Sequence, residues 1–403
     1  MMKILGLKFG NIDWLTVFLC MIWGRDLLNY ANAVFLRLPV LKEFGEYASE
    51  IIIVITLLCC FRSISKHIKK GGVFFYFAWF IAYIFSYFHI NNGKFLDENF
   101  APFFLTVLPM IFVGRAIDIN KLDKPFYIIS VIYVLWKVVM IVFLKSAERE
   151  MGEFTEYNMS AAYNFLPHLL MVTWHFLRKF NIRDFVVTIM GVIALFGMGT
   201  RGPVLCWIVF VAFYFLFARE YKRKVLSIML IVGLATASLT YVNSVFDQLN
   251  YITTSLGLSN RIYKHMEEDM LDSDAGRDRI SKTVLQATSE SGIFGLGICG
   301  DRAATLDNNY SHNLFIEMIA SFGYVLGFVL IAVLILYSFF AWRCCFSQEQ
   351  KGFFLVLLSF NVHLFLSSSF LQTPLFFLFL GYCSRLIYDK RLNLVLYGNT
   401  VQA

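Results

Sequence analysis

Apolar runs of about twenty residues, separated by short polar segments, recur along nearly the whole 403-residue chain. A run of this length can cross the hydrocarbon core of a bilayer as a helix. The chain is 58% hydrophobic and only 16% charged, a balance that a water-soluble domain could not solvate. The sequence therefore predicts an all-α fold and a polytopic integral membrane protein.

The apolar runs predict about 12 transmembrane helices. The predicted spans are 12–30, 44–61, 72–90, 99–117, 126–144, 159–177, 184–199, 203–218, 224–243, 317–342, 352–369 and 372–388. The turn that joins the spans 184–199 and 203–218 is so short that it must stay close to the membrane surface. We see no internal repeat of the kind that inverted-repeat transporters carry.

The distribution of positive charge predicts the orientation. With both termini on one side, that side holds 21 of the 35 Lys and Arg residues, the opposite side holds 13, and Lys137 lies within a span. Six of the 13 lie in one long loop, and without that loop the bias is 21 to 7. Positively charged short loops remain in the cytoplasm, so both termini are predicted to be cytoplasmic. The net charge of +7 is thereby explained without a nucleic-acid partner.

Residues 244–312 form the long loop and are predicted to face outward, away from the cytoplasm. We treat 1–403 as a single transmembrane helical domain, because this loop is too short for an independent enzyme domain with a large core. Within it, the run from Arg277 to Ser289 is predicted to be a helix with Ile280, Val284 and Ala287 facing inward.

Two arginines of this loop are candidate ligands for an anion. Arg277 lies in the first turn of the predicted helix, where free amides and the helix dipole favour negative charge. The fork of its guanidinium matches the oxygens of a pyrophosphate. Arg279 is about 200° around the same helix, so both side chains touch one ligand only if the helix begins late. A solvated loop charge is the alternative for each.

Arg201 is a third candidate for pyrophosphate binding. It lies between two predicted spans in the turn Gly199-Thr200-Arg201-Gly202-Pro203. An arginine at this depth is costly without a partner, which favours a functional role. Snorkelling to lipid headgroups is the structural alternative.

His312 directly precedes the apolar run from 314 to 342. An uncharged imidazole accepts a proton from an attacking hydroxyl near neutral pH, so His312 is the candidate catalytic base. A hydrogen-bonded structural histidine is the alternative. Asn313 and Glu317 follow it, and these neighbours make the position more specific.

The acidic pair Asp272 and Asp274 resembles a metal-binding Asp-x-Asp of nucleotide-sugar enzymes. Its predicted place is away from the cytoplasm, where nucleotide-sugars are made. We therefore interpret the pair as helix caps and solvated charge, and we expect no metal and no cofactor.

Three motifs together resemble the O-antigen polymerase and O-antigen ligase superfamily. They are Thr200-Arg201-Gly202-Pro203, then Ala275-Gly276-Arg277 with Gly292-Ile293-Phe294-Gly295-Leu296-Gly297, and then Ser311-His312-Asn313-Leu314-Phe315-Ile316-Glu317 with Phe322-Gly323. The motifs cover roughly the C-terminal half of the chain, and the first 180 residues match only in hydropathy.

The resemblance implies about a dozen helices, one large periplasmic loop, and an inverting, metal-independent glycosyl transfer in the bacterial inner membrane. It implies an undecaprenyl-pyrophosphate-linked glycan as donor and as acceptor. His312 would be the base, and Arg201 and Arg277 would bind the pyrophosphate. Arg279 has no firm counterpart. Membrane lipids surround the protein, and a chain-length regulator protein is a further partner that this hypothesis allows.

Three functions remain open at this point. The first is a polymerase that joins lipid-linked repeat units of an O-antigen or capsule, and the motifs favour it. The second is the ligase that transfers the finished glycan to lipid A–core. The third is a non-enzymatic flippase of lipid-linked sugars, which should have charged residues in many spans and no large outer loop.

Overall fold

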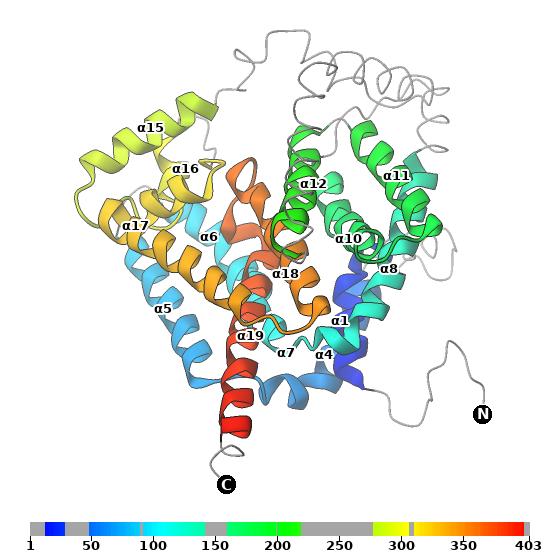
Figure 1. The fold of residues 1–403 in the computed structure, drawn as a ribbon. Coiled ribbons are helices and arrows are strands. Elements are labelled where there is room, and N and C mark those ends of the chain that lie inside the picture. The colour runs from blue at the N-terminus through cyan, green and yellow to red at the C-terminus, as the bar shows by residue number, and fades with distance from the viewer. Residues whose placement is uncertain are drawn as a thin grey trace.

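In a computed structural model, the described residues are 13–28, 48–88, 92–141, 159–198, 200–218, 277–305 and 310–398. Over these ranges the regular secondary structure is all helical, which confirms the predicted all-α class. The helices form one bundle, with α15 and α16 at one end and the last turns of α19 at the other (Figure 1).

Most of the helices overlap the predicted spans. Their bounds are α1 Trp14–Trp23, α4 Ala48–Ser65, α5 Lys70–Ser86, α6 Gly93–Pro102, η2 Phe103–Val107, α7 Met110–Ala116, α8 Ile119–Val139, α10 Met159–Arg178, α11 Ile182–Gly197, α12 Arg201–Phe213, η4 Tyr214–Ala218, α15 Arg277–Glu290, α16 Gly300–Ala304, α17 Leu314–Arg343, α18 Gln348–Asn361, η5 Val362–Phe365, η6 Phe370–Gln372 and α19 Pro374–Gly398. The predicted span 224–243 lies outside the described residues.

Within the described ranges, two helical stretches are long and apolar enough to cross a membrane, Gly93–Ala116 and Leu314–Arg343. The pair Ile51–Ser65 and Lys70–Ser86 would add a third span, although a break bends it by 119°. The full set of about 12 spans and the sidedness of the loops therefore stay predictions.

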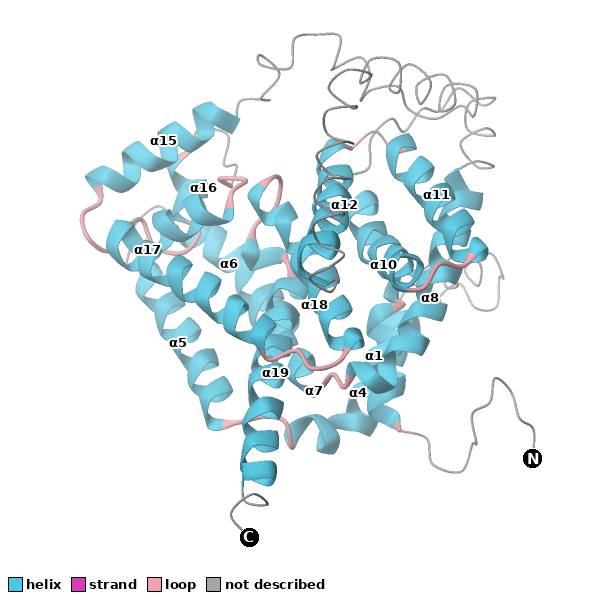
Figure 2. Cartoon of the chain, viewed as in Figure 1, coloured by secondary structure: helices cyan, strands magenta, loops and turns pink. Residues whose placement is uncertain are grey.

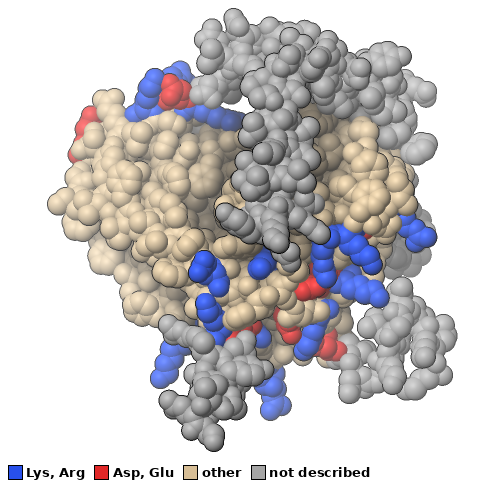
Figure 3. All heavy atoms as spheres, in the orientation of Figure 1, with Lys and Arg blue, Asp and Glu red and all other residues tan. Residues whose placement is uncertain are grey.

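Large apolar side chains on α5 and α17 point outward. Phe74, Phe85 and Val325 are each more than 60% exposed. Surfaces of this kind suit contact with lipid tails rather than water. On the face drawn in Figure 3, Lys and Arg gather at the lower end and at α15, with a mostly uncharged band between them.

The interior of the bundle is built around α10 and α18. Both are buried over most of their length, with Phe165 and Trp174 of α10 and Phe353 of α18 almost fully enclosed. α10 packs on α8, α11, α12 and α18, and α19 packs on α7, α17 and α18. The helices packed around α10 and those packed around α19 together position the polar segments that connect the helices at the upper end of the bundle.

The predicted span 352–369 is wrong in its second half. α18 ends at Asn361, whose side chain turns back to donate to the Leu357 carbonyl at 2.8 Å. The chain then continues as η5, an irregular serine-rich segment and η6 (Figure 2). Serine side chains compete for the backbone here, and Ser369 accepts from the amide of Leu371 at 3.2 Å. Pro374 then restarts a helix as α19.

Candidate active site

The loop before α17 places the candidate base. Asn313 is the N-cap of α17, and its side-chain oxygen accepts from the amides of Phe315 and Ile316 at 2.9 and 3.3 Å. His312 immediately precedes the cap with φ of 54°, a left-handed conformation that is uncommon for histidine. The two residues of the His-Asn pair therefore have separate structural roles. Asn313 caps the helix, and His312 turns the chain away from the helix start.

The His312 ring is half-buried and packs against Tyr310, with ring centroids 4.1 Å apart. Its Nδ1 is buried and has no hydrogen-bond partner among the described residues. Burial, and then the positive charge of Arg277, lower the pKa of His312. The imidazole is therefore uncharged near neutral pH and can accept a proton.

Arg277 begins α15, and the predicted helix from Arg277 to Ser289 is confirmed. Ile280 and Val284 of this helix pack against Ala320 of α17, with Ala287 only partly buried. Arg277 Nη1 donates to the Leu366 carbonyl at 2.7 Å, directly after η5. Next to it, the Tyr310 hydroxyl donates to the Ser367 carbonyl at 3.0 Å. The irregular segment after η5 therefore brings Arg277 and the Tyr310–His312 loop together.

Arg279 lies apart from this cluster. Since α15 is already helical at Arg277, the two side chains lie on different faces, and Arg279 is exposed. The late helix start that would let both arginines reach one ligand is not observed. A role for Arg279 at the site stays a prediction with less support than that for Arg277.

Arg201 is the first residue of α12 and is exposed at the upper end of the bundle. A Cβ at the next residue, Gly202, would lie 2.1 Å from the Tyr163 hydroxyl, so the Tyr163 side chain can take this position only beside a glycine. The Tyr163 ring packs on His363 of η5, with centroids 4.9 Å apart. α12 and α17 both contact η5. No hydrogen bond or ion pair joins Arg201 to Arg277 or His312 among the described residues. The three are linked only indirectly, because α12 and α17 contact η5 and Arg277 bonds to Leu366 directly after it.

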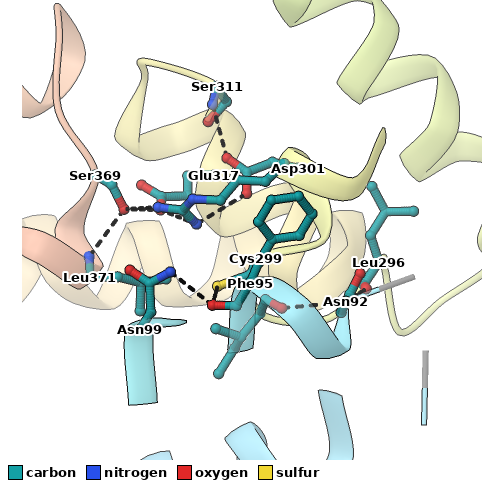
Figure 4. A network of polar contacts seen from close by, with 12 residues as sticks. Asn92, Phe95, Asn99, Leu296, Cys299, Asp301, Ser311, Glu317, Ser369 and Leu371 are labelled. Carbon is teal, nitrogen blue, oxygen red and sulfur yellow. Dashed lines mark hydrogen bonds and ion pairs between the residues drawn. The ribbon is translucent and has the colours of Figure 1, made fainter. Parts of the chain in front are cut away.

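A buried charged network lies behind the His312 loop, and the sequence reasoning missed most of it (Figure 4). Asp301, Arg302 and Glu317 are each less than 5% exposed. Arg302 Nη1 lies 3.6 Å from Asp301 and 4.0 Å from Glu317, and Arg302 Nη2 donates to the Ser369 hydroxyl at 3.0 Å. Ser369 in turn donates to Glu317. Two acidic side chains thus share one guanidinium, whose positive charge offsets part of the buried negative charge.

This network reaches the candidate base through the backbone and through Tyr310. The Asp301 carboxylate accepts from the Ser311 amide at 2.8 Å. The Arg302 guanidinium lies over the Tyr310 ring at 5.7 Å, and the same ring contacts His312. The network therefore fixes both sides of the segment that carries His312.

The glycine motif of the loop packs directly on α17. Gly295 and Gly323 have φ of 72° and 77°, and a Cβ on Gly323 would lie 1.9 Å from the Ile293 carbonyl. The Leu296 amide donates to the Ala320 carbonyl at 2.7 Å. The Phe-Gly-Leu-Gly segment of the loop thus packs directly against the Phe-Gly pair of α17. This contact places α16 and Arg302 beside α17.

Acidic and thiol groups gather nowhere in a pattern that would hold a metal, within the residues that the structure describes. The acidic pair Asp272 and Asp274, interpreted from the sequence as caps, lies outside the described residues. The site that can be described combines a guanidinium, an uncharged imidazole and a buried supporting network.

Fold and site together define a class: a helical membrane protein with a cationic, histidine-bearing site at one end of the bundle. Residues 186–332 match a protein family described as O-Antigen ligase. The chain therefore carries a domain of the O-antigen polymerase and ligase superfamily, as its motifs predict. Members of this family are integral membrane enzymes of the glycosyltransferase type that act on lipid-linked glycans. Comparison with curated proteins and with solved structures finds no match.

Proposed function

We propose that this protein polymerises undecaprenyl-pyrophosphate-linked oligosaccharide repeat units into O-antigen or capsular polysaccharide. The reaction takes place at the periplasmic face of the bacterial inner membrane. The observation that carries the proposal is the meeting of Arg277 and the His312 loop at the segment after η5. A base and a cation at one place are what glycosyl transfer from a pyrophosphate requires.

In the proposed reaction, His312 takes the proton from a hydroxyl group of the acceptor glycan. The hydroxyl oxygen attacks the anomeric carbon of the donor sugar as the bond from that carbon to the pyrophosphate oxygen breaks. The electron pair of the broken bond remains on the pyrophosphate, and attack from the opposite side inverts the anomeric centre. Arg277 and Arg201 stabilise the negative charge that develops on the leaving group.

The buried network supports this chemistry by holding the base. Asp301 accepts from the Ser311 amide and Arg302 packs on Tyr310, so both residues that precede His312 are held in place. Preorganised groups avoid a reorganisation cost during reaction. Arg302 has carboxylate partners and lies 4% exposed, which makes it a supporting residue rather than a pyrophosphate ligand.

A second candidate is the ligase reaction, in which the finished glycan moves to lipid A–core. The matched family, described as O-Antigen ligase, covers both reaction types, so this reaction is a candidate beside the polymerase. Base, leaving group and cations would be the same, and only the acceptor differs.

One reconstitution distinguishes the two. Purified protein in proteoliposomes is supplied with a lipid-linked repeat unit alone, and the products are separated by size. A polymerase yields a ladder spaced by one repeat unit. Product that forms only after lipid A–core is added identifies a ligase, and no transfer under either condition contradicts both.

A further inference from the structure

An apolar groove runs between α5, α7, α17 and α19, from Met318, next to Glu317 of the buried network, to Tyr337 and Arg115 at the lower end of the bundle. Its volume is about 600 Å³, and nearly all of its lining is hydrocarbon. Gly71 and Ala78 of α5 form one wall, and Leu330 and Leu334 of α17 form the opposite wall. The groove is too large to be a packing defect and it lies between two helices that expose large apolar side chains.

The groove is long enough to hold a lipid hydrocarbon chain. Along α5 the lining runs from Gly71 to Ala82, which is about 16 Å at the rise of an α-helix, and along α17 it runs from Met318 to Tyr337, which is about 28 Å. One leaflet takes up half of a hydrocarbon core of about 30 Å. A single lipid chain that enters from the lower membrane surface would therefore fit within the groove.

The lower end of the groove is cationic. Arg115 of α7 lines it, and its guanidinium lies 5.7 Å from the centre of the Tyr388 ring. The ammonium of Lys69, at the start of α5, lies 5.4 Å from the same ring. In the part of the chain that the structure describes, neither Lys69 nor Arg115 forms an ion pair with a carboxylate, whereas the neighbouring Arg385 pairs with Asp389 at 2.8 Å. Two positive charges therefore share one aromatic ring without a counter-ion.

The surroundings of His67 confirm that these charges lie close together. His67 Nδ1 is 3.3 Å from Arg385. Burial lowers the pKa of His67 first, and the charges of Arg385, Arg115 and Lys69 lower it further, against a smaller opposing effect of Asp389. The end of the groove thus has an unbalanced positive charge.

We propose that this groove binds an anionic phospholipid, with one hydrocarbon chain between α5 and α17 and the phosphate against Arg115 and Lys69. Basic pockets between membrane helices recognise anionic headgroups in this way. A zwitterionic headgroup would bring its own ammonium to the cationic cluster and is disfavoured. A Cβ at Gly71, which lines the groove, would meet no atom within 4 Å, so a larger side chain can be introduced there without a clash at the Cβ.

The test is native mass spectrometry of the full-length protein released from nanodiscs that contain phosphatidylglycerol and phosphatidylcholine in equal amounts. The wild-type protein is expected to retain phosphatidylglycerol in preference. Arg115→Gln should lower this preference about fivefold, the effect of one charge near the membrane surface. Gly71→Leu, which fills the groove, should lower retention of both lipids.

Two matched variants serve as controls. Lys121→Gln removes a charge from a side chain that is 72% exposed and should leave the preference unchanged. Gly93→Leu introduces the same side chain at another helix start where a Cβ meets nothing within 4 Å, and it should leave retention of both lipids unchanged.

Three results would overturn the proposal: equal retention of both lipids by the wild-type protein, full retention by Gly71→Leu, or an equal loss in both control variants. Displacement of phosphatidylglycerol by an added polyprenyl phosphate would assign the groove to the polyprenyl donor instead. These outcomes do not depend on glycosyl transfer, so they stand apart from the test of the proposed function.

Discussion

At the scale of single residues, the polar groups of the upper end fall into two sets. Arg201, Arg277 and His312 are exposed or half-buried and lie at helix starts, where a substrate can reach them. Asp301, Arg302 and Glu317 are enclosed and bond to each other and to the backbone. Residues of the first set are the candidates for chemistry, and those of the second set hold the first in place.

The charge of Arg277 should lower the pH at which activity is lost on the acidic side. If His312 is the base, activity is lost as pH falls through its pKa, which burial and then Arg277 hold below the ordinary value. Arg277→Gln removes that charge and should raise the pKa, so the acid limb of kcat/KM moves to higher pH. Arg277→Lys keeps the charge and should leave the limb in place while lowering kcat, because a point charge replaces a fork. Transfer rates measured across pH check both. An acid limb that moves equally in both variants, or in neither, would contradict this electrostatic link.

Arg302→Gln should destabilise the protein strongly. It leaves the buried carboxylates of Asp301 and Glu317 without their cation, and breaking a buried ion pair costs about 3–5 kcal/mol. We expect a marked fall in the thermal unfolding temperature in detergent. Substitution of Arg201, which is exposed, should leave that temperature near the wild-type value. Unfolding of Arg302→Gln at the wild-type temperature would show that the network carries little of the stability.

The sequence predicted the position of those side chains whose role follows from their place at the end of a helix. An arginine at a helix start and a histidine beside a helix cap can be found from local spacing alone. Asp301 and Arg302 give no such signal, because their role depends on Glu317 and Ser369, which are remote in the chain. The one available hint was a carboxylate, Glu317, in the first turn of a strongly apolar helix.

At the scale of elements, the account depends on the contact between the loop from Gly292 to Gly297 and α17. Hydropathy predicted α17 as one span, and the kink at Gly323 is invisible to hydropathy because glycine is compatible with an apolar run. The end of α18 at Asn361 was missed for a related reason, since the residues from Val362 to Leu366 are apolar apart from His363, before three serines interrupt the run. The irregular segment after η5 that receives Arg277 was therefore predicted as helix.

Gly323→Ala should separate the loop from α17. The new Cβ would require a strained φ of 77° and would collide with the Ile293 carbonyl. Strain of this kind costs about 1–3 kcal/mol before the collision is counted. We expect faster proteolysis of the loop around Gly292–Gly297 and loss of transfer, with the protein still in the membrane. Gly71→Ala adds a methyl group into open space and serves as the control. Protection of the loop at the wild-type level would contradict the contact.

At the scale of the whole molecule, composition and hydropathy predicted the all-α class and most helix positions, because membrane helices satisfy their own backbone hydrogen bonds. The meeting of α12, α15 and α17 around η5 was beyond such reasoning. It arises from contacts between residues that are far apart in sequence, such as Arg277 with Leu366. The motif order indicated the correct family, and the structure adds how the motifs touch.

Sidedness is the whole-molecule prediction that follows from charge. We expect Ser289→Cys, in α15, to react with an impermeant thiol reagent added outside intact spheroplasts. A cysteine at Gln348, at the start of α18, should react only after the membrane is opened. The eight native cysteines are free and would first be replaced by serine or alanine. Labelling of the α15 position only from the cytoplasmic side would place the site in the wrong compartment for a periplasmic enzyme.

The central claim is that the His312 imidazole activates the acceptor hydroxyl. The most direct measurement is transfer by purified protein in proteoliposomes supplied with a lipid-linked repeat unit, compared between wild type, His312→Ala and His175→Gln. The account predicts that His312→Ala loses at least about a hundredfold in rate, the usual contribution of a general base, while it binds donor and unfolds at the wild-type temperature. His175 lies in the last turn of α10 and outside the candidate site, so His175→Gln should retain near-normal rates. Product of normal length at a normal rate from His312→Ala would contradict the account.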